Sequence, residues 1–297
     1  KNSDSIYLFP NNSMFFSKLI KYENINRRPD QTFLKKNKNK TEIKVGLIGI
    51  GNFAMSTLIP TINKSAEGYV SSVLGREGLS LYVAQNKFEI DMITTNDSDF
   101  YKNIEALCIT TPHQTHFYFV KKAIELSLPV WVEKPLVISN EELVEVRKKM
   151  LLKKSIYAVG YNRSLAPWTS FVKKKINGKK AKIDMKINAG KLPDAHWLLD
   201  EKTCGGRIIG EFCHFIDLSL TILHHTKLIS VECIKRDRYY QDTGDFILNF
   251  KDGSIVSIQY RYDLPADVPK EKIIVETSKF KYENYNWKKF SGINFIN

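Results

Sequence analysis

The sequence predicts an α/β protein in two parts: a doubly wound parallel sheet, followed by an α+β domain with a largely antiparallel sheet. Three observations predict this fold class. Apolar strand-like runs alternate with helix-like runs from Lys44 to about residue 161. A glycine-rich turn lies between the first strand and the first helix. After about residue 180 the pattern changes to short alternating strands.

The N-terminal part has the regular alternation that right-handed βαβ units require. Ser139 followed by Glu142 is a capping box, which marks the start of its last helix. The expected strands lie at 44–50, 69–75, 104–110, 129–134 and 155–161, and the expected helices at 53–66, 78–88, 115–127 and 140–153.

The C-terminal part has the period-two alternation of half-buried strands. The tripeptide "KDG" at 251–253 is a typical hairpin turn between two of them. The expected strands lie at 182–190, 228–236, 245–250 and 254–262.

The composition excludes several classes of function. The formal net charge is +13, but residues 1–44 hold ten Lys and Arg against four Asp and Glu, and the remaining lysine-rich faces lack interleaved aromatics. We therefore expect no nucleic-acid binding. No apolar run approaches the roughly 20 residues of a membrane span. The four cysteines form no CxxC pair and the histidines lack metal-ligand spacing, so we expect a soluble, cytoplasmic protein without a metal.

The turn "GIGNFA" carries the first chemical motif. In a G-x-G-x-x-G/A fingerprint, Gly49 permits the tight turn, Gly51 lets the backbone approach a pyrophosphate, and Ala54 lets the helix pack against the strand. The helix N-terminus adds N–H donors and a partial positive charge. We therefore expect a Rossmann-type dinucleotide site, with Asn52 and Phe53 completing the turn.

The end of the second strand bears on the choice between NAD and NADP. An Asp or Glu about 20 residues after the fingerprint normally holds the adenosine ribose of NAD. Here the strand ends "SSVLGREG", with Arg76 directly after it and no acid at its tip. Arg76 is either a contact for the 2′-phosphate of NADP or an ordinary surface arginine, and Glu77 could still turn toward the ribose. Both cofactors stay open.

Polar residues follow the third and fourth strands, at the carboxyl edge where open α/β sheets place their ligands. Thr111 and His113 lie in "TTPHQTH", and Glu133 and Lys134 lie in "VEKPL". We expect the first three to line the cofactor and the Lys134 amine to orient a substrate hydroxyl. The alternative for Lys134 is a surface lysine before a turn. His116 is expected to cap the next helix or to lie at the surface.

These motifs, together with "GYNRS" and "GGRIIGEFCHFIDL", resemble the Gfo/Idh/MocA oxidoreductase family over roughly residues 44–282. The tripeptide "NAG" at 188–190 and "HW" at 196–197 resemble its sugar-oxidoreductase branch, which is sometimes fused behind a zinc-type alcohol-dehydrogenase-like domain. The resemblance implies a homodimer or homotetramer that pairs through the C-terminal sheet. We divide the chain into a basic arm or linker (1–43), a Rossmann dinucleotide-binding domain (44–163) and a substrate and oligomerisation domain (164–297) that ends earlier than the family pattern implies.

The run "GGRIIGEFCHFIDL" places Glu211, His214 and Asp217 three apart on an otherwise apolar helix. The resemblance implies that Lys134 and His214 converge on the substrate beside the nicotinamide, with Glu211 on the same helix face as His214. Many members have an acid four residues before this histidine, where this chain has Gly210, so the role of Glu211 stays open. The alternative for His214 is a core histidine held by Asp217.

Further polar and aromatic residues are candidates for binding the substrate. Arg163 could hold a carboxylate or phosphate bidentately, and Trp197 could stack on a pyranose, although an aromatic at this place is often packing. The full set of expected substrate residues is Asn162, Arg163, His196, Trp197 and Arg207.

The expected reaction is hydride transfer between the nicotinamide of NAD or NADP and a secondary alcohol of a sugar or nucleotide sugar. Lys134 and His214 would share proton relay and orientation of the substrate. Three alternatives stay open: a glycosidase-like enzyme that retains NAD, a non-enzymatic sensor of cofactor or sugar, and an inactive truncated relative.

Overall fold

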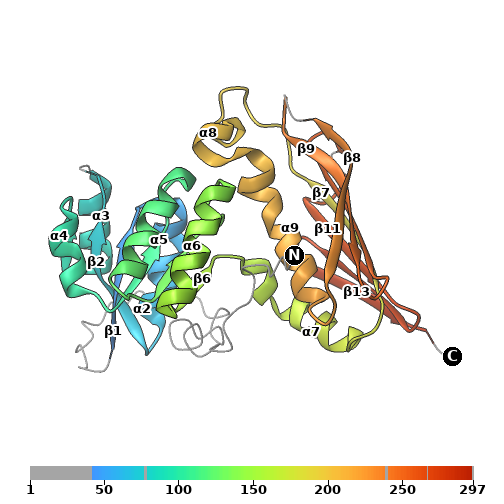
Figure 1. The fold of residues 1–297 in the computed structure, drawn as a ribbon, viewed down its shortest axis with the longest axis horizontal. Helices are drawn as coiled ribbons and strands as arrows, with labels where there is room; N and C mark the ends of the chain where they lie inside the picture. The colour runs from blue at the N-terminus through green and yellow to red at the C-terminus, as the bar shows by residue number, and fades with distance from the viewer. Residues whose placement is uncertain (1–41, 77–78, 238–239, 266, 296–297) are drawn as a thin grey trace. The chain divides into compact units, whose positions relative to one another are not determined.

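The computed structural model of the protein describes residues 42–295, apart from 77–78, 238–239 and 266. The described residues form two compact units that are divided between Gly160 and Tyr161, three residues before the predicted boundary. Figure 1 draws the N-terminal unit in blue to green and the C-terminal unit in yellow-green to red. Most of the predicted basic arm (residues 1–41) and Glu77 lie outside the described residues.

The N-terminal unit is built on a six-stranded sheet in which all strands are parallel, in the order β3-β2-β1-β4-β5-β6. This is the strand order of a doubly wound dinucleotide-binding fold, which confirms the predicted fold class. The strands are β1 (Ile43–Ile48), β2 (Gly68–Leu74), β3 (Met92–Thr94), β4 (Ala106–Ile109), β5 (Val130–Val132) and β6 (Tyr157–Val159).

Helices cover both faces of this sheet because successive residues of its strands point to opposite sides. Leu107 and Ile109 of β4 pack with α5 and α6, whereas Cys108 between them packs with α2 and α3. The helices are α2 (Ile59–Lys64), α3 (Leu79–Phe88), α4 (Asp97–Phe100), α5 (His116–Glu125) and α6 (Asn140–Lys153), with a π-helical turn at Ala54–Leu58 and 3₁₀ turns at Tyr101–Asn103 and His113–Thr115.

The predicted cap of α6 forms with a small difference. The backbone N–H of Glu142 donates to Ser139 Oγ at 3.2 Å, as a capping box requires. The Glu142 carboxylate accepts from the backbone N–H of Ile138 at 3.2 Å, one residue before the cap. Both bonds satisfy N–H groups at the helix start.

The C-terminal unit contains a seven-stranded sheet in the order β13-β12-β11-β7-β10-β9-β8. All neighbouring pairs are antiparallel except β7 and β10, as the predicted largely antiparallel sheet requires. The strands are β7 (Lys182–Asn188), β8 (Leu228–Asp237), β9 (Thr243–Phe250), β10 (Ile255–Arg261), β11 (Glu271–Glu276), β12 (Phe280–Tyr285) and β13 (Lys289–Asn294).

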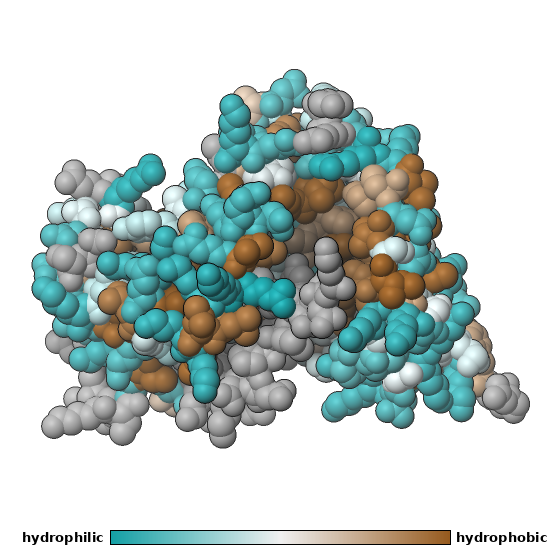
Figure 2. All heavy atoms as spheres, viewed as in Figure 1, coloured by the Kyte–Doolittle hydropathy of each residue, from teal (hydrophilic) through white to brown (hydrophobic). Residues whose placement is uncertain are grey.

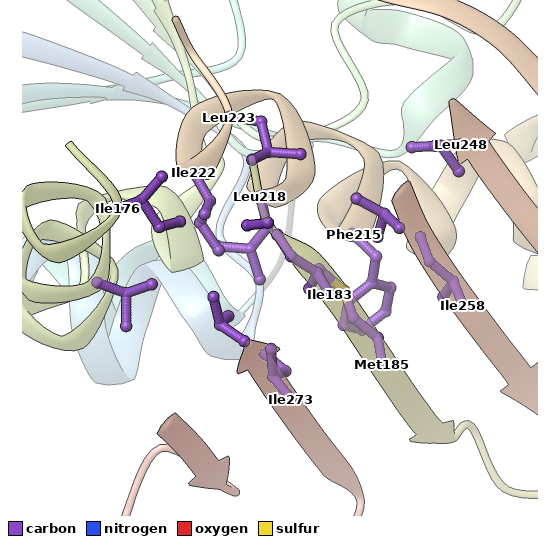
Figure 3. Close-up of a cluster of buried hydrophobic side chains, with 14 of the residues drawn as sticks. Ile176, Ile183, Met185, Phe215, Leu218, Ile222, Leu223, Leu248, Ile258 and Ile273 are labelled. Atoms are coloured by element: carbon purple, nitrogen blue, oxygen red, sulfur yellow. The ribbon is translucent and has the colours of Figure 1, made fainter. Parts of the chain in front are cut away.

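One face of this sheet packs against α7 (Pro167–Ile176) and α9 (Cys213–Ile222), with the short α8 (Glu201–Cys204) before α9. Figure 3 shows Phe215, Leu218 and Ile222 of α9 directed at aliphatic side chains of the strands. A π-helical turn (Ile208–Phe212) leads into α9, and 3₁₀ turns lie at Asn162–Leu165 and Trp197–Leu199.

Several elements were not predicted. The strand β3 is short and all three of its residues are only half-buried, so its sequence lacks the strongly apolar run of a central parallel strand. The helix α7 was hidden by the lysine run that we interpreted as a solvated face, although Trp168, Val172 and Ile176 recur every four residues and are buried. The three strands that follow residue 270 complete the C-terminal sheet beyond the strands we expected.

The surface is mostly hydrophilic on the face that Figure 2 shows, with hydrophobic residues in small groups. Within the described part of the chain, no helix has the length and apolarity that crossing a membrane requires.

Candidate functional site

The glycine turn after β1 is fixed by contacts that leave no room for a side chain at Gly49. This residue has φ +94°, and a Cβ there would lie 2.8 Å from the carbonyl oxygen of Thr110. The Thr110 hydroxyl donates to the carbonyl oxygen of Gly49 at 2.8 Å. The end of β1 is therefore tied to the end of β4, and only glycine fits the turn without strain.

Gly51 differs, because a Cβ there would meet no atom within 4 Å. Its carbonyl oxygen accepts from the N–H of Met55 at 3.1 Å, so it belongs to the first turn of the helical segment. Ala54 is fully buried against the sheet. The open space at Gly51 beside a helix N-terminus is the cradle that a pyrophosphate needs.

Asn52 and Phe53 lie on the outer side of this turn. The carbonyl oxygen of Asn52 accepts from the Ser56 hydroxyl at 2.7 Å. The Phe53 ring stacks on Trp131 of β5, with centroids 6.3 Å apart, and is 40% exposed. Phe53 therefore covers the edge of the sheet and also presents an apolar surface to a ligand.

The end of β2 carries the residues that bear on NAD or NADP. Gly75 donates its N–H to the carbonyl oxygen of Thr94 at 3.2 Å, which holds the tip of β2 against β3. Arg76 is exposed directly after it. Among the described residues from Gly68 to Arg76 none is acidic, so this part of the chain carries a guanidinium and no carboxylate at the tip of β2.

His116 corrects the sequence-based expectation of a surface or capping histidine. It is fully buried. Its Nδ1 lies 2.7 Å from the carbonyl oxygen of Pro135, and its Nε2 lies 2.8 Å from that of Thr111. Burial lowers the pKa of His116, and the two carbonyls oppose this effect. The sequence did not indicate this burial, because the Pro135 carbonyl belongs to the loop after β5 and is distant from His116 in the sequence.

The loops after β4 and β5 are thus joined, and they bring together four of the expected residues. Thr111 accepts from the Thr115 hydroxyl at 2.7 Å, and His113 is buried with its ring 5.7 Å from that of His116. Both lie at the carboxyl edge of the sheet, as do Glu133 and Lys134.

Glu133 lies in a confined place. A Cβ at Gly160 would come within 2.7 Å of its Oε1 and 2.9 Å of the Trp131 ring, so the glycine leaves room for both side chains as they lie. Burial raises the pKa of Glu133 to about 7, although the charge of Lys134 acts against the shift. A carboxyl group beside Lys134 that changes charge near neutral pH is suited to proton exchange.

The C-terminal unit contains the second group of candidates around α9. His214 is mostly buried, and its ring meets Tyr161 edge-on at 5.8 Å. The Ser164 hydroxyl donates to the Asp217 carboxylate, and burial raises the pKa of Asp217 to about 6. The structure therefore pairs Asp217 with Ser164, which fastens α9 to the 3₁₀ turn at its side.

Glu211 lies in the π-helical turn at Ile208–Phe212, whereas His214 lies in the α-helix that follows it. The carboxylate of Glu211 reaches β10 of the sheet. There its Oε2 accepts from Arg207 Nε and from the Tyr260 hydroxyl, each at 2.6 Å. Arg207 is 1% exposed, so this expected substrate residue lies in the interior.

Arg163 makes the bidentate contact that we expected, but with a carboxylate of its own chain. Its Nε donates to Glu271 at 2.9 Å and its Nη2 donates to the other carboxylate oxygen. The guanidinium also lies 5.1 Å from the centre of the Phe215 ring. Burial raises the pKa of Glu271, but Arg163 and the Trp287 N–H outweigh it and hold the pKa below its usual range. Asn162 beside it is exposed.

His196 and Trp197 lie in the segment between β7 and α8. The Nδ1 of His196 accepts from the N–H of Leu198 at 3.2 Å, which caps a 3₁₀ turn. The two rings stack with centroids 5.9 Å apart, and Trp197 is 49% exposed. Trp197 thus exposes an apolar area to solvent, of the kind that a sugar ring covers.

Sequence reasoning missed the partners of these residues. Polar side chains at Ser164, Gln241, Tyr260 and Glu271 are buried in an apolar unit and hold the expected residues in place. The signal available in the sequence was weak, because single polar residues in strands are common. Among the described residues, no group of three or more His, Cys, Asp or Glu is arranged to hold a metal ion.

The strand order, the glycine turn and the open space at Gly51 define a dinucleotide-binding Rossmann domain followed by an α+β domain. Residues 43–161 match the model of the Gfo/Idh/MocA oxidoreductase family, described as having an NAD-binding Rossmann fold. This part of the chain is therefore similar to that family.

Known proteins share parts of this similarity, and the chain spans less than half the length of the curated relative it matches. An oxidoreductase of Formosa agariphila is 30% identical over 131 residues, which are 42% of this chain and 40% of that protein. The dehydrogenase WlbA of Bordetella pertussis, solved with NADH and UDP-GlcNAcA, has a TM-score of 0.73 at 18% identity, covering 86% of this chain and 84% of its own. An aldose-aldose oxidoreductase of Caulobacter crescentus has a TM-score of 0.74 at 12% identity, covering 86% and 83%. Both solved structures share the fold of the two units.

Proposed function

We propose that the protein is an NAD- or NADP-dependent oxidoreductase that transfers hydride between the nicotinamide and a secondary alcohol of a sugar or nucleotide sugar. The observation that carries this proposal is the contrast between the two glycines of the turn. Gly49 is closed in by Thr110, whereas Gly51 faces open space at the start of a helix. The fold needs the first glycine, whereas the second leaves the backbone at the helix start accessible to a ligand.

The residues present fit a dinucleotide. Backbone N–H groups of the turn after Gly51 would hold the pyrophosphate, and Arg76 would lie beside the adenosine ribose or its 2′-phosphate. Thr111, His113 and Glu133 at the carboxyl edge would line the nicotinamide end. The nicotinamide, when bound, accepts or delivers the hydride.

The protein's own part of the reaction is to position the alcohol and to handle its proton. In the oxidation direction the carbon loses hydride and the hydroxyl loses a proton. The Lys134 amine would orient the hydroxyl, and the imidazole of His214 would accept its proton. Glu133 beside Lys134 gives this amine a nearby carboxyl group whose charge changes near neutral pH.

The sugar class is the finer part of the proposal. It is supported by the half-exposed Trp197 ring, and by two proteins of similar fold, an aldose-aldose oxidoreductase and a dehydrogenase solved with UDP-GlcNAcA. The side chains of Arg163 and Arg207 bind groups of this chain. They would therefore support sugar binding indirectly, by holding the segments that they contact.

The test is titration of the protein with NAD, NADH, NADP and NADPH, followed by quenching of tryptophan fluorescence. A Gly51→Asp variant introduces a carboxylate where the pyrophosphate would lie, and we expect it to weaken binding about 100-fold or more, or roughly 2.7 kcal/mol. Because no atom lies near that position, the variant should keep the melting temperature within about 2 °C. A Lys134→Ala variant should bind cofactor normally and lose turnover.

Turnover then separates the alternatives. Formation of free NADH or NADPH from a sugar supports the proposal, whereas net hydrolysis without free reduced cofactor indicates a glycosidase-like enzyme. Cofactor binding without turnover of any sugar or nucleotide sugar favours a sensor. Failure of the wild-type protein to bind any of the four cofactors would refute the proposal.

A further inference from the structure

Arg207 is the largest of the fully buried side chains in the described part of the chain. Its charge is balanced by Glu211, at 2.6 Å from Nε, and its guanidinium lies 5.6 Å from the centre of the Tyr260 ring. The remaining donors bind backbone. Nη1 donates to the carbonyl oxygen of Gly190 at 2.9 Å, and Nη2 donates to that of Ala189. A buried arginine therefore fastens the end of β7.

Gln241 extends the same attachment along the chain. It is fully buried, and its amide both accepts from the N–H of Leu192 at 2.8 Å and donates to the carbonyl oxygen of Leu192 at 3.1 Å. Its Oε1 also lies 3.5 Å from Arg207 Nη1. The side chains of Arg207 and Gln241 together bind backbone groups of three residues, Ala189, Gly190 and Leu192.

The neighbouring Asp242 holds the turn that carries Arg207. Its Oδ2 accepts from the N–H of Ile208 at 2.9 Å, and its Oδ1 accepts from the fork of Arg236. A Cβ at Gly206 would lie 2.7 Å from Oδ2, so the glycine lets the carboxylate approach. The backbone beside Arg207 is thus held by Asp242, and the guanidinium at the end of its side chain is held by Ala189 and Gly190.

These contacts fix the start of the segment that carries His196 and Trp197. Side chains at 193–195 are exposed, whereas Leu198 at the far end is buried and its carbonyl oxygen accepts from Cys204 Sγ at 3.1 Å. The segment 189–198 is therefore an exposed loop fixed at both ends. Arg207 and Gln241 provide the attachment at the β7 end.

We propose that Arg207, together with Gln241, is a positioning residue that holds the loop 189–198 in the shape in which Trp197 and His196 receive the sugar. This inference rests on the proposed function and deepens it, because it assigns sugar recognition to a loop held by a buried arginine. Arg207 itself does not touch the sugar. Its donors are used by Ala189, Gly190 and Glu211.

The chemistry of the contact requires arginine. A guanidinium presents donors in a fixed plane, so it can bind one carboxylate and two carbonyls at once while lying on an aromatic face. A lysine in the same place keeps the charge, but it donates from a single nitrogen atom. It therefore cannot reproduce the separate bonds that Nη1 and Nη2 make to the two carbonyls. The substitution Arg207→Lys therefore loosens the loop while preserving charge balance with Glu211.

The experiment compares Arg207→Lys and Gln241→Met with the wild-type protein. Arg261→Lys is the matched control, because Arg261 pairs with Asp263 and Asp245 near the same sheet and its side chain does not bind the loop. Three quantities are measured on each full-length variant: hydrogen exchange of the peptide covering 189–199, the Kd for NAD(H) or NADP(H), and the KM and kcat for a panel of glucose, UDP-glucose and UDP-GlcNAcA.

For Arg207→Lys and Gln241→Met we expect faster exchange in 189–199 and a KM for the sugar raised about tenfold or more, since small misplacements of binding groups are costly. The Kd for the cofactor should stay within about twofold, because the dinucleotide residues belong to the other unit. The control Arg261→Lys should leave the exchange of the loop and the KM unchanged.

Three results would overturn the inference: an unchanged KM despite a loosened loop, an unchanged loop in both variants, or an Arg207→Lys variant whose kcat falls while its KM stays the same. If Arg207→Lys fails to fold, the Gln241→Met variant decides alone. Cofactor binding by the wild-type protein tests the proposed function separately. A wild-type protein that binds cofactor but none of the sugars refutes this inference and leaves the dinucleotide site standing.

Discussion

At the scale of single residues, the chain shows which roles a sequence reveals and which it hides. The turn at Gly49 and the packing of Ala54 could be predicted because their neighbours are local and the turn follows a strand. The contacts of Arg163 and Arg207 could not, because Glu271 and the carbonyl oxygens of Ala189 and Gly190 are distant in the sequence. A bidentate arginine was foreseeable as a type of contact, but whether it binds a ligand or its own chain was not.

Asp217 gives a prediction about pH. Burial raises its folded-state pKa to about 6 from an ordinary 3.8, so the folded protein keeps a proton that the unfolded chain loses. The contribution of this residue to stability therefore falls as the pH rises from about 4 to about 6, by at most roughly 3 kcal/mol. Above that range the loss is complete.

The variant Asp217→Asn tests this assignment. Asparagine keeps an oxygen that accepts from Ser164 and cannot ionise, so the free energy of unfolding between pH 4 and 7 should vary less than in the wild-type protein. Urea denaturation at several pH values measures the free energy of unfolding of both proteins. Parallel pH profiles for the two proteins would show that Asp217 ionises normally in the folded state.

At the scale of elements, hydrophobic pattern predicted the strands and helices from residue 44 to 161, because a parallel sheet covered on both faces has strongly apolar strands. It failed where apolar residues are diluted by charge. The alternation of Ile273 and Val275 in β11, and of Phe280 and Tyr282 in β12, marks buried positions among lysines and glutamates. The π-helical turn before α9 was also beyond prediction, since its sequence fits an ordinary helix.

The C-terminal end of α6 offers a prediction with an internal control. Lys154 has φ +49°, a left-handed conformation that glycine adopts without cost, whereas Lys153 is still helical. Lys154→Gly should therefore stabilise the N-terminal unit by about 0.5–1 kcal/mol, and Lys153→Gly should destabilise it by up to about 1 kcal/mol. Thermal or urea unfolding of both variants measures the difference, and equal effects would contradict the reason given.

At the scale of the whole molecule, the fold class and the family model that residues 43–161 match agree with what the motifs imply. The motifs agree with the fold for a physical reason: they lie at the carboxyl ends of parallel strands, where open α/β sheets place their ligands. The homodimer or homotetramer stays a prediction. It depends on the face of the C-terminal sheet opposite α7 and α9.

A substitution in the middle of that face tests the prediction. Ser257 lies on β10, between β7 and β9, and alternates with the buried Val256 and Ile258. Ser257→Arg would place a charge in a self-complementary interface, so we expect light scattering to show a monomer where the wild-type protein gives a dimer or tetramer. Ser80→Arg, at an exposed position of α3, is the control. A wild-type protein that scatters as a monomer would refute the prediction.

The ring of His116 has a consequence for motion in the N-terminal unit. It lies between the carbonyl oxygens of Thr111 and Pro135, and a neutral imidazole, which burial favours, donates to one of them at a time. The buried ring still fills the space between the loops after β4 and β5. We therefore expect a displacement of the loop at Thr111 to be accompanied by a displacement of the loop that carries Lys134.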